Sequence, residues 1–121
     1  MKHLALFKTS TSDDILSGKI KVEIRFSKTK VPPFGIVSTG DIVYIKPVGK
    51  EIIGQFRVKK VIYYDGIEKE DLEDLKDKYS LKLLPKDTKY LTLIFIADSS
   101  RFITSPIKMP KKNLRGWVVL E

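Results

Sequence analysis

Residues 19–26 alternate between charged and apolar side chains without a break, and this run restricts the fold more than any other part of the sequence. Its apolar positions are Ile20, Val22, Ile24 and Phe26. Its charged positions are Lys19, Lys21, Glu23 and Arg25. Successive side chains of a β-strand point to opposite faces, so the run predicts a strand with one apolar and one charged face. We expect a central barrel strand whose apolar side chains lie inside.

The charged face of this predicted strand places three cations in a row. Side chains on the same face of a strand lie about 7 Å apart. Phosphates along an extended nucleic-acid strand are spaced at about 6–7 Å, a similar distance. The row therefore favours contact with a nucleic-acid backbone. An ordinary solvated strand face is the alternative interpretation.

The residues before the strand predict a short helix over 11–17. Ser12 can cap its N-terminus, and Asp13 and Asp14 would then lie in its first turn, where the helix dipole favours acidic side chains. Gly18 suits the left-handed conformation that commonly follows the end of a helix. The predicted order of elements is therefore strand, short helix, glycine and charged strand.

This order and these residues resemble the ASCH family, whose domains are PUA-like β-barrels. The signature of the family is Gly-x-Lys-x-x-Glu-x-Arg, after a short helix that ends in a pattern such as Ile-Leu-x-Gly. The chain matches it with the segment 15–18 and with Glu23 and Arg25, whereas Ile20 stands at the lysine position. The motif covers residues 15–25, and the resemblance extends over most of the chain.

The resemblance implies a ligand cleft between the motif strand and the loop that follows it. The residues that it places there are Gly18, Glu23, Arg25, Lys28 and Lys30. Because Glu23 lies between Lys21 and Arg25, we expect its pKa to be held low, so that it orients the Arg25 guanidinium rather than transferring protons. That guanidinium could then bind a phosphate through two N–H groups or stack on a base.

The remaining sequence predicts one β-rich domain over residues 1–121. Alternating apolar residues, interrupted by Gly and Pro, predict further strands over 2–8, 41–47, 51–64, 89–97, 101–104 and 117–120. The strand over 51–64 should bend near Gly54. The long loop 27–40 contains two adjacent prolines, and leucines at helical spacing predict a helix over 67–79. The predicted fold class is mainly β with short helices (α+β), a closed or nearly closed PUA-like β-barrel of about six strands.

The chain carries a net charge of +8, and this charge is distributed unevenly. Residues 67–78 hold six acids and three bases, so the rest of the chain carries +11. A surplus of this size favours a polyanionic partner, and we expect RNA or another nucleic acid. A solubility surface rich in lysine is the alternative.

Two further clusters have a composition that suits nucleic-acid contact. The segment 108–115 holds four cations and no acid, which is typical of segments that bind a phosphate backbone. Its candidate contacts are Lys111, Lys112 and Arg115. Arg101 precedes Phe102, and an arginine beside an aromatic ring can stack with a base. Together with the cleft residues and with Lys19 and Lys21, these are the predicted RNA contacts.

The composition disfavours several other classes of protein. The chain has no cysteine and one histidine, His3, which we expect at the surface or at a sheet edge. No convergent set of metal ligands is visible, so neither a metal nor another cofactor is predicted. The apolar runs are too short for a membrane span or a secretory signal, so we expect a cytoplasmic protein that does not contact membranes. The lack of cysteine, with few methionines and abundant Lys, Ile and Glu, is typical of thermophilic proteins.

Three functions of different classes are consistent with these features. The first, which we predict, is RNA binding in the basic cleft, without a catalytic residue. The second is hydrolysis of RNA or of a modified nucleoside, because some ASCH proteins are ribonucleases or amidohydrolases of acetylated cytidine. Those amidohydrolases use the motif lysine as a base and a threonine at the position of Glu23, and an apolar Ile20 cannot transfer a proton. The third is a protein-interaction module that docks its acidic helix on a basic partner.

Overall fold

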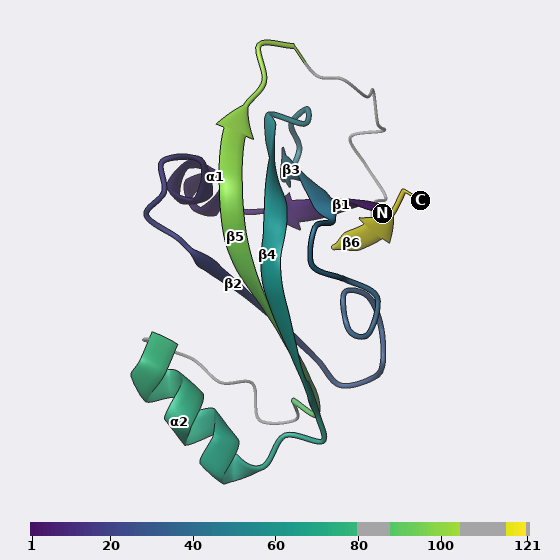
Figure 1. Ribbon diagram of the computed structural model, residues 1–121, viewed down its shortest axis with the longest axis vertical. Coiled ribbons are helices and arrows are strands. Elements are labelled where there is room, and N and C mark those ends of the chain that lie inside the picture. The colour runs from purple at the N-terminus through teal and green to yellow at the C-terminus, as the bar shows by residue number, and fades with distance from the viewer. Residues whose placement is uncertain (80–87, 105–115, 121) are drawn as a thin grey trace.

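The strands of this chain form a curled sheet in the shape of a half-barrel (Figure 1). The computed structural model describes residues 1–79, 88–104 and 116–120. Its elements are β1 (Lys2–Phe7), α1 (Thr9–Leu16), β2 (Val22–Ser27), β3 (Ile42–Pro47), β4 (Gly54–Asp65), α2 (Lys69–Tyr79), β5 (Tyr90–Arg101) and β6 (Trp117–Val119). The strand order is β2-β5-β4-β3-β1-β6, in which β1 and β3 are parallel and the other neighbours are antiparallel. This arrangement confirms the predicted fold class, a mainly β fold with short helices.

The observed strands differ from the predicted ranges mainly at their ends. β4 begins at Gly54, and β5 runs through to Arg101, so the separate strand predicted over 101–104 is wrong. β5 continues because it accommodates an extra residue opposite β4, where Asp98 adopts a positive φ of 50°. The irregularity lets the two long strands keep pairing where the sequence Asp-Ser-Ser predicts a turn.

The helix α1 begins before its predicted range and lacks the predicted cap. Lys8 is the N-cap residue, whereas the Ser12 hydroxyl lies inside the helix and donates to the Lys8 carbonyl oxygen at 3.1 Å. Asp13 and Asp14 therefore lie beyond the first turn. Gly18 follows the helix with a φ of +83°, the left-handed conformation that its sequence position predicted.

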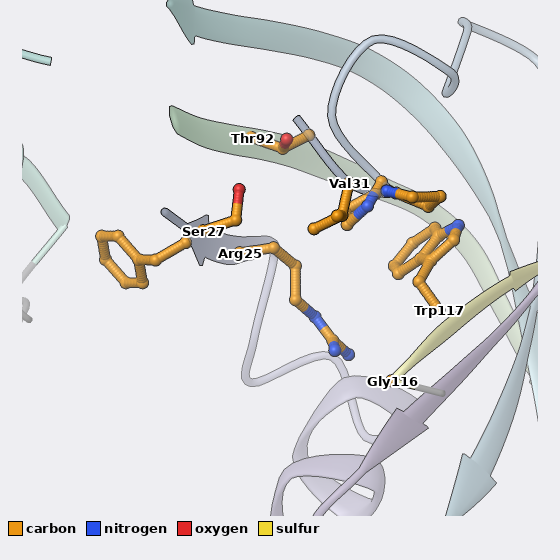
Figure 2. A pocket seen from close by; sticks show the side chains of 9 residues that line it. Arg25, Ser27, Val31, Thr92, Gly116 and Trp117 are labelled. Atoms are coloured by element: carbon orange, nitrogen blue, oxygen red, sulfur yellow. The ribbon is translucent and has the colours of Figure 1, made fainter. Parts of the chain in front are cut away.

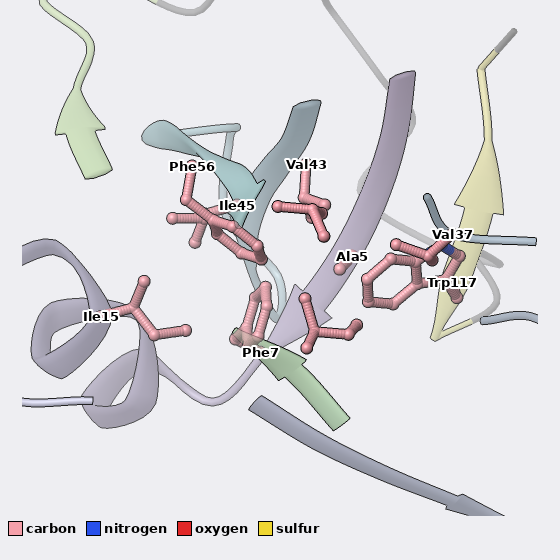
Figure 3. Close-up of a cluster of buried hydrophobic side chains, with 10 residues drawn as sticks. Ala5, Phe7, Ile15, Val37, Val43, Ile45, Phe56 and Trp117 are labelled. Atoms are coloured by element: carbon pink, nitrogen blue, oxygen red, sulfur yellow. The ribbon is translucent and has the colours of Figure 1, made fainter. Parts of the chain in front are cut away.

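The main hydrophobic core lies inside the half-barrel and is covered at one end by α1 (Figure 3). Its buried members are Ala5, Phe7, Ile15, Val37, Val43, Ile45, Phe56, Val58, Ile94 and Trp117. They come from α1, from the loop after β2 and from every strand except β2. A separate buried cluster of Leu75, Leu91 and Leu93 joins α2 to the outer face of the sheet.

The place and the orientation predicted for β2 are wrong. β2 is an end strand of the sheet rather than a central one, and its apolar face packs on the outer cluster beneath α2. The residues of that face are Val22, Ile24 and Phe26. Glu23 and Arg25 point inward instead, whereas Lys19 and Lys21 are exposed and Ile20 packs against the main core. Because α2 covers the outer face, both faces of β2 are partly buried, and alternation alone does not tell which one faces the core.

Candidate functional site

A pocket of about 500 Å³ opens between the C-terminal half of β2, the loop that follows it and the start of β6 (Figure 2). Its described lining residues are Arg25, Phe26, Ser27, Val31, Pro32, Pro33, Thr92, Gly116 and Trp117. A volume of this size lies within the range of sites for small ligands. The pocket lies between the motif strand and its loop, where the family resemblance implied a ligand cleft.

Arg25 is the lining residue with the most extensive set of contacts. Its Nε–H donates to Glu23 Oε1 at 3.1 Å, and its Nη2 donates to the carbonyl oxygen of Leu6 in β1 at 2.8 Å. The guanidinium also lies 4.8 Å from the ring centre of Phe7 and 5.4 Å from that of Trp117. Arg25 therefore connects β2, at one end of the strand order, with β1 and β6 at the other, and its side chain is held in one orientation.

The guanidinium retains donors for a ligand. Arginine has five N–H groups, and the two hydrogen bonds to Glu23 and Leu6 use two of them. The other three have no acceptor among the residues that the structure describes. Arg25 is 22% exposed and lines the pocket, so these donors are fixed in place beside a space that a ligand can enter.

Burial dominates the electrostatics of the Glu23–Arg25 pair. Desolvation raises the pKa of Glu23, and this effect exceeds the opposing attraction and hydrogen bond from Arg25. The sequence prediction of a lowered pKa is therefore wrong, because Glu23 lies inside the half-barrel rather than on a solvated face between cations. Desolvation likewise lowers the pKa of Arg25. An arginine nonetheless stays protonated in a protein, so the pair is an internal ion pair with no net charge at neutral pH.

The floor of the pocket is formed by β5, and a loop covers it. Thr92 of β5 is fully buried and lies between Arg25 of β2 and Tyr63 of β4 in the strand register. The Tyr63 hydroxyl accepts a hydrogen bond from the Val37 N–H at 2.7 Å and donates one to the Val37 carbonyl oxygen at 2.5 Å. Phe34 packs on Tyr63 as well, with ring centres 5.3 Å apart. These contacts fix the loop after β2 over the inner face of the sheet.

Trp117, which lines the pocket, is held in place by a buried polar network. Its Nε1–H donates to His3 Nδ1 at 3.1 Å, so the proton of His3 is on Nε2, which donates to Asp41 Oδ2 at 2.8 Å. Asp41 also accepts a hydrogen bond from the Ser38 N–H and pairs with the amino group of Met1. Burial alone would raise the pKa of Asp41, but these partners together lower it below its ordinary value.

The prediction that His3 lies at the surface or at a sheet edge is wrong. The side chain is fully buried, because β1 lies between β3 and β6 in the sheet and residue 3 faces the interior. Its role is to hold Trp117 in place. The network could not be read from the sequence, since His3 and Trp117 are 114 positions apart.

The structure brings only some of the predicted contact residues together at the pocket. Lys28 and Lys30 are exposed on the loop that covers it, and Lys30 pairs with Asp65 at 3.5 Å. Gly18, Lys19 and Lys21 lie at the opposite end of β2, where Gly18 and Lys21 line a different groove. Arg101 is exposed and pairs with Asp13 at 3.4 Å, away from the pocket. The predicted contacts Lys111, Lys112 and Arg115 lie outside the described residues.

The lining residues that sequence reasoning missed are Phe26, Ser27, Val31, Pro32, Pro33, Thr92, Gly116 and Trp117. The one available signal was the long loop with two adjacent prolines, which is unusual in a compact domain. Within the described ranges, no acidic or histidine side chains are grouped as metal ligands, and no helix is long and apolar enough to cross a membrane. The cytoplasmic location stays a prediction.

Comparison with known proteins identifies the fold. No family model and no curated protein matches the sequence. The chain is similar to solved structures of an ASCH protein from Zymomonas mobilis. A serine-to-alanine variant gives a TM-score of 0.66 at 15% identity, over 99% of this chain and 88% of the other. A tyrosine-to-phenylalanine variant gives 0.60 at 17% identity over 83% and 71%, and a third structure gives 0.57 at 17% identity over 83% and 69%. The fold is therefore that of an ASCH domain, the fold that the family resemblance implied.

Proposed function

We propose that this chain is an RNA-binding ASCH-type domain that holds one nucleotide of a single strand in the Arg25 pocket. The observation that carries the proposal is the guanidinium of Arg25, which is fixed by Glu23, Leu6 and two aromatic rings and keeps three donors beside a pocket of about 500 Å³. Recognition of single-stranded RNA commonly takes an unstacked base into such a site, where arginine or an aromatic ring contacts it.

Cations beside the pocket support a polyanionic ligand. Lys28 and Lys30 are exposed and adjoin the lining residues Ser27 and Val31 in the sequence. The chain as a whole carries +8, so long-range attraction also favours nucleic acid. Lys28 and Lys30 form the rim of the pocket. An RNA strand whose base enters the pocket would place its phosphates along this rim. The basic segment 108–115 precedes the lining residue Gly116 in the sequence and remains a predicted auxiliary contact.

Hydrolysis is a less well supported function for the same pocket. A hydrolase needs a group that accepts a proton from water or from a nucleophile. Arg25 is the one ionisable side chain among the described lining residues, and a guanidinium does not serve as a base at neutral pH. The hydroxyls of Ser27 and Thr92 have no basic partner in that set. Binding therefore explains the described geometry better than catalysis does.

Two double variants of equal charge test the proposal. Lys28→Ala with Lys30→Ala removes both cations of the rim, and Lys2→Ala with Lys50→Ala removes two exposed cations elsewhere. Anisotropy of fluorescently labelled octauridine is measured against salt from about 50 mM upward. The rim variant should bind more weakly and lose roughly 0.7 of the logarithmic salt slope for each phosphate contact removed. The control variant should stay close to the wild type.

The fluorescence of Trp117, the single tryptophan of the chain, locates the binding site. Because its ring forms part of the pocket wall, RNA in the pocket should change its emission. Lack of RNA binding by the wild type at low salt would refute the proposal. Equal loss in both double variants, with unchanged Trp117 emission, would show that the net charge rather than the pocket attracts RNA.

A further inference from the structure

We infer that the pocket selects a base with a keto oxygen at C4 of a pyrimidine or C6 of a purine, uracil or guanine, over adenine. This inference rests on the proposed function and adds a sequence preference to it. It depends on three features of the described site, namely its charge, the polarity of its hydrogen-bonding groups and its apolar lining.

The charge of the site favours a neutral ligand group over a phosphate. The Arg25 guanidinium is matched by the Glu23 carboxylate at 3.1 Å, and both side chains are mostly buried, at 22% and 14% exposed. A phosphate in the pocket would meet a nearby carboxylate and no excess positive charge. A neutral base gains the hydrogen bonds of the guanidinium without that repulsion. The exposed lysines of the rim are the better partners for phosphate.

The hydrogen-bonding groups of the pocket are predominantly donors. The guanidinium of Arg25 cannot accept a hydrogen bond, and three of its N–H groups lack an acceptor in the described part of the chain. The indole N–H of Trp117 is already bound to His3. The hydroxyls of Ser27 and Thr92 can donate or accept, so they adapt to the ligand. The fixed donors therefore require acceptors. Guanine offers two adjacent acceptors, O6 and N7, and uracil offers O4, whereas the amino group of adenine is a donor and would leave one of the guanidinium N–H groups without a hydrogen bond.

The pocket has apolar surface beside the guanidinium. Trp117 and the loop residues Val31, Pro32 and Pro33 are its apolar lining residues, and Figure 2 shows Val31 and Trp117 near one another with Arg25 beside them. The guanidinium lies 5.4 Å from the ring centre of Trp117. A base that packs on this apolar surface would present its edge to the guanidinium, which is the geometry of keto recognition by arginine.

Two purine nucleotides test the inference in the wild type. Inosine and adenosine 5′-monophosphate have the same size and phosphate, but inosine carries a keto group where adenosine carries an amino group. We expect inosine monophosphate to change Trp117 emission with at least about fivefold higher affinity, the lower limit for a good bidentate contact. Equal affinities, or a preference for adenosine, would overturn the inference.

A conservative variant assigns the preference to Arg25. Arg25→Lys keeps the positive charge beside Glu23 but loses the planar fork, so the keto preference should disappear. Arg57→Lys makes the same change in an exposed pair with Asp98 and should keep the preference. If Arg25→Lys does not fold, the wild-type comparison of the two nucleotides still decides. Octauridine and octaadenosine separate the two proposals, because equal binding of both refutes the base preference alone, whereas binding of neither refutes the proposed function.

Discussion

Replacing Arg25 with methionine tests how the Glu23–Arg25 pair contributes to folding. Arg25→Met keeps apolar volume beside Phe7 and Trp117 but leaves the Glu23 carboxylate, which is 14% exposed, without its partner. Keeping Glu23 protonated at pH 7 requires about 1.36 kcal/mol for each pH unit above its ordinary pKa of 4.5, about 3.4 kcal/mol in all. This value is the upper limit of the destabilisation caused by the unpaired Glu23. If burying the charged carboxylate required more free energy than protonating it, Glu23 would take up a proton instead.

The lost hydrogen bond to the Leu6 carbonyl oxygen adds about 1 kcal/mol. We expect Arg25→Met to lower the free energy of unfolding by up to about 4 kcal/mol at neutral pH, which shifts the urea midpoint by up to about 2 M for an m-value near 2 kcal/mol per M. Burial raises the pKa of Glu23 in the folded state, so the penalty grows as the pH rises above 4.5, is complete above the raised pKa, and is relieved as the pH falls toward 4.5. Between pH 7 and pH 5 the variant should regain up to about 2.7 kcal/mol relative to the wild type.

The double variant Glu23→Gln with Arg25→Met removes the unpaired charge. It should unfold within about 1–2 kcal/mol of the wild type and show little of this pH dependence. Arg57→Met is the matched control, because its partner Asp98 is 66% exposed and such pairs contribute less than about 1 kcal/mol. Two outcomes would refute the argument that the unpaired Glu23 carboxylate destabilises the variant. One is equal destabilisation of Arg25→Met at both pH values, and the other is a double variant that is less stable than the single one.

Three further substitutions test individual contacts of the fold. Gly54→Ala should lower the free energy of unfolding by about 1–3 kcal/mol in thermal denaturation, because the added Cβ would lie 2.5 Å from the Ser100 carbonyl oxygen; an unchanged midpoint would contradict this. Tyr63→Phe should cost about 2 kcal/mol and speed amide exchange at Val37, whose N–H and carbonyl both bond to the hydroxyl; unchanged exchange would argue against the anchor. Because its partners lower the pKa of Asp41, the stability that its carboxylate contributes should be complete above pH 3.8 and decline as the pH falls below that value. In urea titrations, Asp41→Asn should therefore lack this loss of stability at acidic pH.

The sequence carried enough information for the fold because its local signals agree with one another. Alternation marked the strands, and Gly18 marked the end of α1 through a conformation that glycine adopts readily. The separation of Glu23 and Arg25 by two positions placed both side chains on one face of a strand, and the structure shows them hydrogen bonded there. These inferences need no knowledge of distant contacts, which explains why they succeed.

The orientation of β2 needed information that alternation does not contain. An alternating strand has two faces, and the apolar one is expected to face the core when the other meets solvent. Here Leu75 of α2 closes the outer face over Ile24 and its neighbours, while the ion pair of Glu23 and Arg25 occupies the inner one. Because α2 covers the outer face, the apolar side chains of β2 point outward, opposite to the prediction. A predicted acidic helix with a leucine face was the signal that a second apolar surface had to be covered somewhere.

The pocket depends on contacts between residues that are far apart in the sequence, and this has a consequence for function. Arg25 meets Leu6 and Phe7 of β1 and Trp117 of β6, so the same side chain links the two ends of the strand order and presents donors to the pocket. Under the proposed function, folding and recognition are coupled at one residue. Truncating Arg25 would then remove both, and weaker RNA binding by such a variant would not separate them. Arg25→Lys keeps the positive charge but loses the planar guanidinium. Measuring both the free energy of unfolding and the affinity of this variant distinguishes recognition of a base from the link between the two ends of the sheet.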